Sequence, residues 1–244
     1  MAWVLDLDGV IWLADQPIAG AAEAVARLRD GGERVLFVTN NSYAPVGEQE
    51  AKLERFGIPA RGDVVNSAMA AATLVAPGER ALVCGGPGVV EAVRARGAEP
   101  VREGDADVVI VGFHRDFDYE RLRVAVAAVR RGARLVGTND DATYPTPEGP
   151  IPGGGAIVAA VAYAAGVTPV VAGKPHEPMA DLVRGLAGGD GTVVGDRPDT
   201  DGRFAKAIGY RFALVLSGVT RPDDLPVTPA PDVVADDLAA LVPA

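Results

Sequence analysis

The stretch Trp3-Val4-Leu5-Asp6-Leu7-Asp8-Gly9-Val10 places two carboxylates, one residue apart, directly after a short apolar run. The run predicts a buried strand, and an open α/β sheet places its chemistry at the carboxyl ends of its strands. Residues i and i+2 of an extended chain point to the same side, so we expect Asp6 and Asp8 to face one cavity unless the chain has begun to turn. Two like charges at that distance call for a cation or a shared proton. The pair indicates a divalent metal, with magnesium favoured by oxygen ligands, although calcium loops and plain turns use the same residues.

The composition is that of a folded, acidic chain. Its 244 residues allow one large domain or two modest ones, and 48% of them are hydrophobic. The abundance of Val, Ala and Leu suits parallel strands packed by Ala-rich helices. A formal net charge of -10 argues against nucleic acid or an anionic membrane as partner, because both attract positive surfaces.

The single cysteine, Cys84, ends the apolar run Ala81-Leu82-Val83-Cys84. We predict a small buried side chain there, and one cysteine allows no disulfide within the chain. No stretch of about 18 uninterrupted apolar residues occurs, and the first predicted strand begins too early for a secretory leader. These features lead us to expect a cytoplasmic protein.

Short apolar runs alternate with segments of helical period, which is typical of βαβ units and a mainly parallel sheet flanked by helices. The economical arrangement is an α/β core made of residues 1–75 and 168–244. Residues 76–167 would then form an inserted, smaller α/β domain that could close over the core as a lid. We predict strands at 3–5, 34–38, 81–84, 108–111, 134–137, 169–172, 192–194, 212–216 and 233–235, the last four belonging to the core. We predict helices at 21–29, 48–56, 68–75, 89–96, 119–131, 156–165 and 236–241.

Other polar residues follow separate predicted strands. The hydroxyl of Thr39, with the amides of Asn40 and Asn41, could hold the oxygens of an anion, although a turn between strand and helix uses the same residues. Lys174 stands between a glycine and a proline just past an apolar run. That position favours a fixed lysine that points inward over a solvated one.

Two further carboxylates lie near the end of the strand at 192–194. Asp196 follows the strand closely, and Asp201 comes five residues later in an acidic turn. Acidic turns are usually only solvated. Here four polar clusters follow four separate buried strands, and that coincidence indicates one shared site.

The ordered set of these segments resembles the haloacid dehalogenase (HAD) superfamily of phosphatases, and in particular its NagD and 4-nitrophenylphosphatase-like subfamily. The resemblance covers nearly the whole chain and implies a Rossmann-like core with an inserted class IIA cap. Gly202 departs from the family, which commonly has an aliphatic residue after the second aspartate of the last motif. The matching segments are Asp6-Leu7-Asp8-Gly9-Val10, Thr39-Asn40-Asn41, Gly173-Lys174-Pro175 and Gly195-Asp196 through Thr200-Asp201, with Gly112-Phe113-His114-Arg115-Asp116-Phe117 and Asp141-Ala142-Thr143-Tyr144-Pro145 in the cap.

The resemblance implies a magnesium-dependent phosphatase that hydrolyses small phosphomonoesters through an aspartyl-phosphate. Asp6 would be the nucleophile, and Asp8 would act as general acid and then as general base. The Asp6 side chain, the Asp8 backbone carbonyl and the Asp196 side chain would hold Mg²⁺.

The same resemblance assigns roles to the remaining polar residues. Lys174 and Thr39 would neutralise and position the phosphoryl oxygens, helped by the groups of Asn40 and Asn41. Asp201 would orient Lys174 or a water molecule on the metal.

The sequence indicates the substrate less clearly than it indicates the reaction. A lid of this size favours small phosphomonoesters over phosphoproteins. The candidate substrates are glycerol phosphate, phosphoglycolate, nucleoside monophosphates and sugar phosphates. Among these we favour a short polyol or hydroxyacid phosphate. His114 and Arg115 are candidate substrate contacts, although an ordinary surface pair is an alternative. The exposed faces of the inserted domain could also pair in a homodimer.

Two other functions use the same residues. A phosphotransferase or phosphomutase would pass the aspartyl-phosphate to a sugar hydroxyl. A noncatalytic module that binds a phosphorylated metabolite would keep the acidic pocket without turnover, and the presence of Asp8 argues against it.

Overall fold

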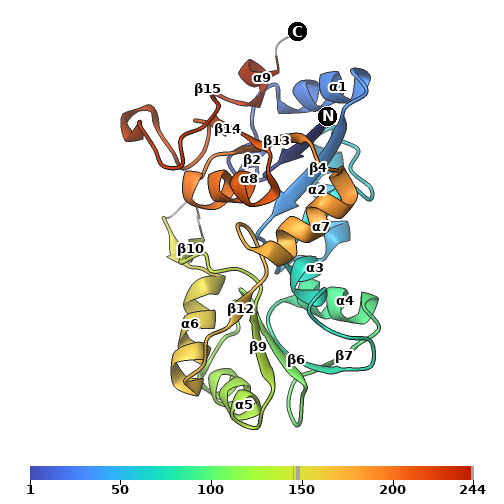
Figure 1. The fold of residues 1–244 in the computed structure, drawn as a ribbon, viewed down its shortest axis with the longest axis vertical. Coiled ribbons are helices and arrows are strands. Elements are labelled where there is room, and N and C mark those ends of the chain that lie inside the picture. The colour runs from blue at the N-terminus through green and yellow to red at the C-terminus, as the bar shows by residue number, and fades with distance from the viewer. Residues whose placement is uncertain (145, 147–148, 243–244) are drawn as a thin grey trace. The chain divides into compact units, whose positions relative to one another are not determined.

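The computed structural model describes residues 1–144, 146 and 149–242, so Pro145, the last residue of the expected cap motif, lies outside the described residues. The chain divides into two compact units (Figure 1). The first unit contains Met1–Thr39, Gly47–Val65 and Lys174–Ala244, and the second contains Asn40–Val46 and Asn66–Gly173. Each unit is built around its own β-sheet.

The first unit is built on a six-stranded sheet with the order β15-β14-β13-β1-β4-β5. Its centre is β1 (Ala2–Leu5), which pairs in parallel with β13 (Gly191–Gly195) on one side and β4 (Arg34–Thr39) on the other. Leu5 lies opposite both Val194 and Phe37, so the three strands end at the same edge of the sheet. The remaining strands are β14 (Arg211–Val215), β15 (Val233–Ala235) and β5 (Val64–Asn66).

Helices cover this sheet by presenting apolar faces to it. In α7 (Glu177–Ala187) the buried residues are Met179, Ala180 and Val183, at the spacing of one helix face. Helix α7 packs beside α8 (Arg203–Ile208), and α1 (Ala21–Asp30) packs beside α9 (Leu238–Leu241). The unit also contains α2 (Val46–Arg55), the short helical turns η1 (Pro198–Gly202) and η2 (Pro222–Asp224), and a hairpin of β2 (Trp12–Leu13) with β3 (Gln16–Pro17).

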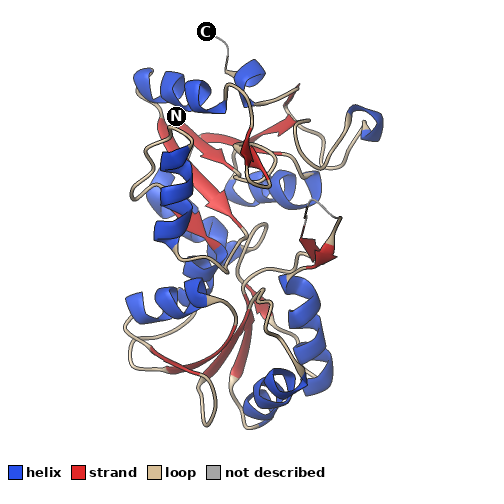
Figure 2. Ribbon diagram, turned by 180° about the vertical axis from the view of Figure 1, so that it is seen from behind, coloured by secondary structure: helices blue, strands red, loops and turns tan. Residues whose placement is uncertain are grey.

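The second unit is built on a five-stranded sheet with the order β12-β9-β8-β6-β7. Its central strand, β8 (Val108–Val111), is buried along its whole length, as an apolar run in a parallel sheet should be. Helices lie on both sides of these strands (Figure 2). The other elements are β6 (Arg80–Cys84), β7 (Glu99–Val101), β9 (Arg134–Gly137), β12 (Val170–Val171), the hairpin of β10 (Thr143–Tyr144) and β11 (Ile151–Pro152), α3 (Ser67–Ala72), α4 (Pro87–Ala95), α5 (Tyr119–Arg130) and α6 (Gly154–Ala165).

The predicted fold class is confirmed: both main sheets are flanked by helices, and their described strand pairings are parallel. Cys84 is buried, as predicted. In the described part of the chain, no helix combines the length and apolarity needed to cross a bilayer.

One predicted strand lies elsewhere than expected. The run at 169–172 was assigned to the core, but its two-residue strand β12 pairs with β9 at the edge of the second sheet. Helix α3 also groups with the second unit because it packs against α4. The compact units therefore differ from the predicted boundaries at 40–46, 66–75 and 168–173, and the division into catalytic core and inserted cap stays a prediction.

We predict that the central sheet of the first unit tolerates side-chain truncation poorly. Leu36 in β4 is 0% exposed, whereas Leu186 in α7 is 47% exposed. Leu36→Ala should lower the free energy of unfolding by about 2–5 kcal/mol because it leaves a cavity. The same truncation at Leu186 should cost only about 0.5 kcal/mol. Urea unfolding of both variants measures the difference, and equal losses would contradict the described packing.

Candidate active site

Three carboxylates meet at the carboxyl edge of the first sheet. The amide of Asp6 donates to the carbonyl of Val194 at 2.9 Å, which extends the β1–β13 pairing by one residue. Asp196 directly follows β13, and Asp201 comes from the turn η1. Among the described residues, carboxylate oxygens of Asp6, Asp196 and Asp201 lie within 4.8 Å of one another. Parallel register therefore brings together residues that are far apart in the sequence.

A buried cation compensates part of this charge. Lys174 is 2% exposed, and its Nζ lies 2.8 Å from Asp6 Oδ1 and 2.7 Å from Asp201 Oδ1. Burial disfavours the charged ammonium, but the two carboxylates prevail and raise the pKa of Lys174 above its ordinary value. The lysine therefore stays protonated inside the site. Its burial agrees with the prediction that it is fixed and points inward.

The Asp6 carboxylate is held by one of its oxygens. Oδ1 accepts from Lys174 and from the backbone amide of Leu7, which lies 2.8 Å away. Neither contact uses Oδ2. Burial raises the pKa of Asp6, and Lys174 opposes that effect. Asp6 is thus oriented by two donors and leaves one oxygen for a ligand.

Asp196 is held in a narrow backbone cradle. Its Oδ2 accepts from the amide of Val219 at 2.6 Å. A Cβ at either Gly9 or Gly218 would overlap this carboxylate, and Gly9 also adopts a φ of +82°, so both positions need glycine. Burial, together with the charges of Asp201 and Asp6, raises the pKa of Asp196 to about 8.

Asp201 is fully engaged by protein donors. Its Oδ1 accepts from Lys174, and its Oδ2 accepts from the amide of Arg197 at 3.1 Å. Burial raises the pKa of Asp201 to about 6, although Lys174 favours its charged form. The cluster keeps three carboxylates around one ammonium, and such an all-oxygen set with excess negative charge fits a hard divalent cation.

Asp8 lies in a different environment from Asp6. The chain turns directly after β1, since the carbonyl of Leu7 accepts from the amides of Ile11 at 2.9 Å and Trp12 at 3.2 Å. The Asp8 side chain accepts from the indole Nε1 of Trp12 at 3.0 Å. Burial raises the pKa of Asp8, opposed by this hydrogen bond and by the charge of Lys52. The expected pair is therefore split between two sets of partners.

Thr39 and the two asparagines after it are placed differently. Thr39 is buried at the carboxyl end of β4, the neighbour of β1. Asn41 Oδ1 accepts from the amide of Tyr43 at 3.0 Å, which is the turn named as an alternative. Asn40 Nδ2 donates to Asp141 Oδ2 at 2.9 Å within the second unit. Both asparagine side chains thus have structural partners.

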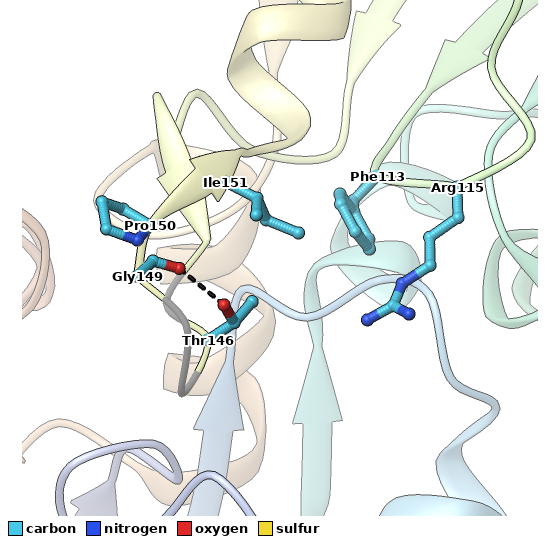
Figure 3. Close-up of a pocket in the computed structure, with 6 residues that line it drawn as sticks. All are labelled: Phe113, Arg115, Thr146, Gly149, Pro150 and Ile151. Atoms are coloured by element: carbon cyan, nitrogen blue, oxygen red, sulfur yellow. Dashed lines mark hydrogen bonds between the residues drawn. The ribbon is translucent and has the colours of Figure 1, made fainter.

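The two candidate substrate contacts in the second unit differ in exposure. His114 is 4% exposed, with Nδ1 donating to the carbonyl of Gly112 at 2.9 Å and Nε2 lying 3.9 Å from Cys84 Sγ. Arg115 is exposed and lines a pocket of about 510 Å³ together with Phe113 (Figure 3). The other residues that line it are Thr146, Gly149, Pro150 and Ile151.

Several residues around the site were not singled out from the sequence. Trp12 and Lys52 contact or face Asp8, and Val219 binds Asp196 through a backbone amide. The sequence position of Trp12 could have indicated its contact, because a tryptophan four residues after an aspartate in a turn can donate its indole N–H to that carboxylate. The backbone amide of Val219 carries no residue-type signal.

Family models and curated relatives agree on the family. A haloacid dehalogenase-like hydrolase model matches residues 3–99, and a HAD-hydrolase-like model matches residues 171–241. The chain is 40% identical to the D-glycerol 3-phosphate phosphatase of Mycobacterium tuberculosis over 88% of its length, and it spans 63% of that relative. It is 36% identical to an acid sugar phosphatase of Staphylococcus saprophyticus, with 92% of this chain and 89% of the relative covered.

Solved structures give the same result. The p-nitrophenyl phosphatase of Archaeoglobus fulgidus superposes with a TM-score of 0.92 at 33% identity, covering 99% of this chain and 97% of that one. The glycerol phosphate phosphatase of M. tuberculosis, solved in complex with magnesium, gives a TM-score of 0.91 at 36% identity, covering 99% of this chain and 76% of that one. The chain therefore belongs to the haloacid dehalogenase-like hydrolases, among the NagD and 4-nitrophenylphosphatase-like phosphatases of that family.

Proposed function

We propose that the protein hydrolyses small phosphomonoesters through an aspartyl-phosphate on Asp6, with Mg²⁺ as cofactor. The observation that carries this proposal is the Asp6 carboxylate, oriented by Lys174 and Leu7 beside two further buried carboxylates. A nucleophile with one engaged oxygen and one remaining oxygen is suited to attack phosphorus in a fixed direction.

In the first step, an Asp6 oxygen attacks phosphorus and the bond from phosphorus to the ester oxygen breaks. Asp8 gives its proton to the departing alkoxide. The raised pKa of Asp8 supports this role, because desolvation shifts this carboxyl toward the protonated form that an acid needs. The products of this step are the free alcohol and the aspartyl-phosphate.

In the second step, water attacks the phosphorus of the aspartyl-phosphate. Asp8, now a carboxylate, takes a proton from that water. The bond between the Asp6 oxygen and phosphorus breaks, inorganic phosphate leaves, and both aspartates return to their starting states. One displacement is thereby divided into two easier ones.

The donor set supports a magnesium site. The side chains of Asp6 and Asp196 and the backbone carbonyl of Asp8 would hold the ion, whereas both oxygens of Asp201 already accept from protein donors. A bound Mg²⁺ supplies the charge that lets an anionic carboxylate approach an anionic phosphate. Solved magnesium and calcium complexes of the M. tuberculosis relative support the same proposal.

The remaining residues would position the phosphoryl group. Lys174 contributes a permanent positive charge, and Thr39 contributes a buried hydroxyl at the end of β4. Asp201 holds Lys174 in place through the 2.7 Å contact. We keep Asn40 and Asn41 in the proposal through their backbone amides rather than their side chains.

The names of the relatives support small substrates of several kinds. A 5′-nucleotidase of Bacillus subtilis, 34% identical over 91% of this chain and 90% of its own length, adds nucleotides to the glycerol and sugar phosphates named above. We favour a short polyol or hydroxyacid phosphate and propose Arg115, rather than the buried His114, as a substrate contact. Cytoplasmic location and small molecules as partners complete the proposal, and the homodimer stays a prediction.

We predict that Asp6→Asn abolishes phosphate release. The amide is a poor nucleophile, so activity on a panel of phosphomonoesters should fall by several orders of magnitude, and chelation of divalent cations should stop the native enzyme as well. Asp199→Asn is the matched control, because that carboxylate is 62% exposed. Turnover that survives Asp6→Asn would disprove the nucleophile, and transfer of phosphate to an added sugar would indicate the phosphotransferase.

We predict that Asp196→Asn stabilises the metal-free protein increasingly as the pH rises above 4. The folded-state pKa of about 8 lies above the unfolded value of 3.8, so the contribution of protonated Asp196 is fully present below pH 4 and is lost progressively as the pH rises to 8. Asparagine mimics the protonated group, so the unfolding temperature should rise by several degrees at pH 9 and little at pH 4.

Magnesium tests the same carboxylate independently of activity. Addition of Mg²⁺ should raise the unfolding temperature of the native protein and leave that of Asp196→Asn unchanged, because ligand binding stabilises only a folded site that can bind. An equal gain in stability at both pH values would contradict the raised pKa of Asp196, and a full magnesium response in the variant would contradict the proposed metal site.

We predict that Arg115→Met selectively weakens binding of esters that carry a carboxylate. Loss of a charge-assisted contact should raise KM for phosphoglycolate about tenfold and change KM for glycerol phosphate less. Arg123→Met is the control, because Arg123 is 59% exposed and pairs with Glu120. Steady-state kinetics on both esters measures the ratio, and an equal change for both would remove Arg115 from the proposed contacts.

A further inference from the structure

The side chain that holds Asp8 comes from the turn that Asp8 itself begins. Trp12 is 4% exposed, and its Nε1 donates to Asp8 Oδ1 at 3.0 Å. The backbone closes the same turn, because the amide of Gly9 donates to the carbonyl of Trp12 at 2.7 Å. The indole and the carboxylate are therefore fixed to each other by both side-chain and backbone contacts.

Residues from α2 and its end hold the indole in turn. The ammonium of Lys52 lies 4.3 Å from the centre of the Trp12 ring, close enough for a cation–π contact. The ring of Phe56 meets the indole edge-on, with the centroids 6.0 Å apart. Lys52 also donates to the carbonyl of Ala14 at 2.7 Å, which ties α2 to the hairpin loop after Trp12.

The donor chemistry of tryptophan favours one carboxyl oxygen as the site of the proton. An indole N–H only donates, and the carbonyl oxygen of a carboxylic acid accepts a hydrogen bond more strongly than its hydroxyl oxygen does, so the proton is favoured on the oxygen that the indole does not bind. A protonated Asp8 therefore carries its hydrogen on Oδ2, while Oδ1 stays bound to Trp12. A fixed oxygen matters because proton transfer requires the donor and acceptor atoms to lie within hydrogen-bond reach.

Resting on the function proposed above, we propose that Trp12 is a positioning residue that orients Asp8 so that Oδ2 delivers the proton to the leaving group. Lys52 supports this role by holding the indole ring. The contacts described here do not involve Lys174 or Asp201, so the general acid and the nucleophile are oriented by separate sets of side chains.

Leaving-group dependence distinguishes this role from a merely structural one. An alkoxide needs a proton as it departs, whereas 4-nitrophenolate is stable enough to leave without one. The ratio kcat/KM reports the steps up to formation of the aspartyl-phosphate and is independent of its later hydrolysis. A defect in proton delivery should therefore lower kcat/KM for an alkyl ester and largely spare it for an aryl ester.

The test is Trp12→Phe, which removes the N–H and keeps an aromatic ring in place. With glycerol phosphate, or the alkyl ester of the panel that turns over fastest, kcat/KM should fall at least about tenfold, part of the 100- to 10,000-fold range for acid–base catalysis. With 4-nitrophenyl phosphate, the change should stay within about threefold. Adding Trp12→Phe to Asp8→Asn should cause little further loss on the alkyl ester, because the two residues act as one unit.

Two further variants complete the design. Trp3→Phe makes the same chemical change in β1, outside these contacts, and should leave both kcat/KM values unchanged. Lys52→Met keeps most of the length of the side chain and removes its charge, so it should give a smaller loss with the same preference for the alkyl ester. Thermal unfolding of each variant confirms that the protein compared is folded.

The outcomes separate this inference from the proposed function. If Trp12→Phe slows both esters equally, or if its effect multiplies with that of Asp8→Asn, then Trp12 only supports the fold and the positioning role is wrong. If the native protein hydrolyses neither ester, or if Asp6→Asn retains activity, the proposed function itself fails and the positioning role fails with it. A selective loss that disappears in the Asp8→Asn background establishes the role.

Discussion

The ammonium group of Lys174 lies between two carboxylates inside the first unit, where the lysine is 2% exposed. Its contacts with Asp6 and Asp201 are 2.8 and 2.7 Å long, and a third carboxylate, Asp196, lies in the same cluster. Burying a charge without a partner is costly, and removing one member of a buried pair typically costs about 3–5 kcal/mol. The geometry of the whole cluster therefore depends on this lysine, and the remaining negative charge creates the demand for a further cation.

Parallel pairing explains how one edge of a sheet collects these groups. β1 lies between β13 and β4, and their registers end the three strands together. Asp6, Asp196 and Thr39 therefore reach the same edge although they come from distant parts of the chain. Lys174 arrives by a different route, because it follows β12, an edge strand of the second sheet. The residues of the site are therefore positioned both by the order of the strands in the first sheet and by the path of the chain after β12.

The two carboxylates of the opening motif receive different environments from a turn of a few residues. Asp6 still belongs to the sheet through its amide and contacts a cation, whereas Asp8 lies in the turn and accepts from a neutral indole. Enzymes separate the roles of two acids by giving them unlike surroundings. The nearby ammonium favours the ionised form of Asp6 required of a nucleophile, whereas burial favours the protonated form of Asp8 required of an acid and outweighs the opposing hydrogen bond from the indole. The turn after β1 is therefore as important to the proposed chemistry as the carboxylates themselves.

The sequence was sufficient for the fold class and for the residues of the carboxylate cluster. Buried parallel strands such as β8 are visible as unbroken apolar runs, and polar residues that directly follow such runs are visible as candidates. The two-residue strands β2, β3, β10 and β11 were not predicted, since so short an element has no period. Helix α7 was not predicted either, although its buried positions have the spacing of one helix face.

By itself, then, the sequence determined the longer buried strands and the charged residues that follow them, because both follow from local apolar patterning. Only the tertiary structure decided the partners of those residues: that β12 joins the second sheet, that Asp201 is engaged through both oxygens, that His114 is buried against Cys84, and that Trp12 holds Asp8. Those outcomes depend on contacts between residues whose side chains meet only after packing, and no local pattern encodes the direction in which a side chain finally points.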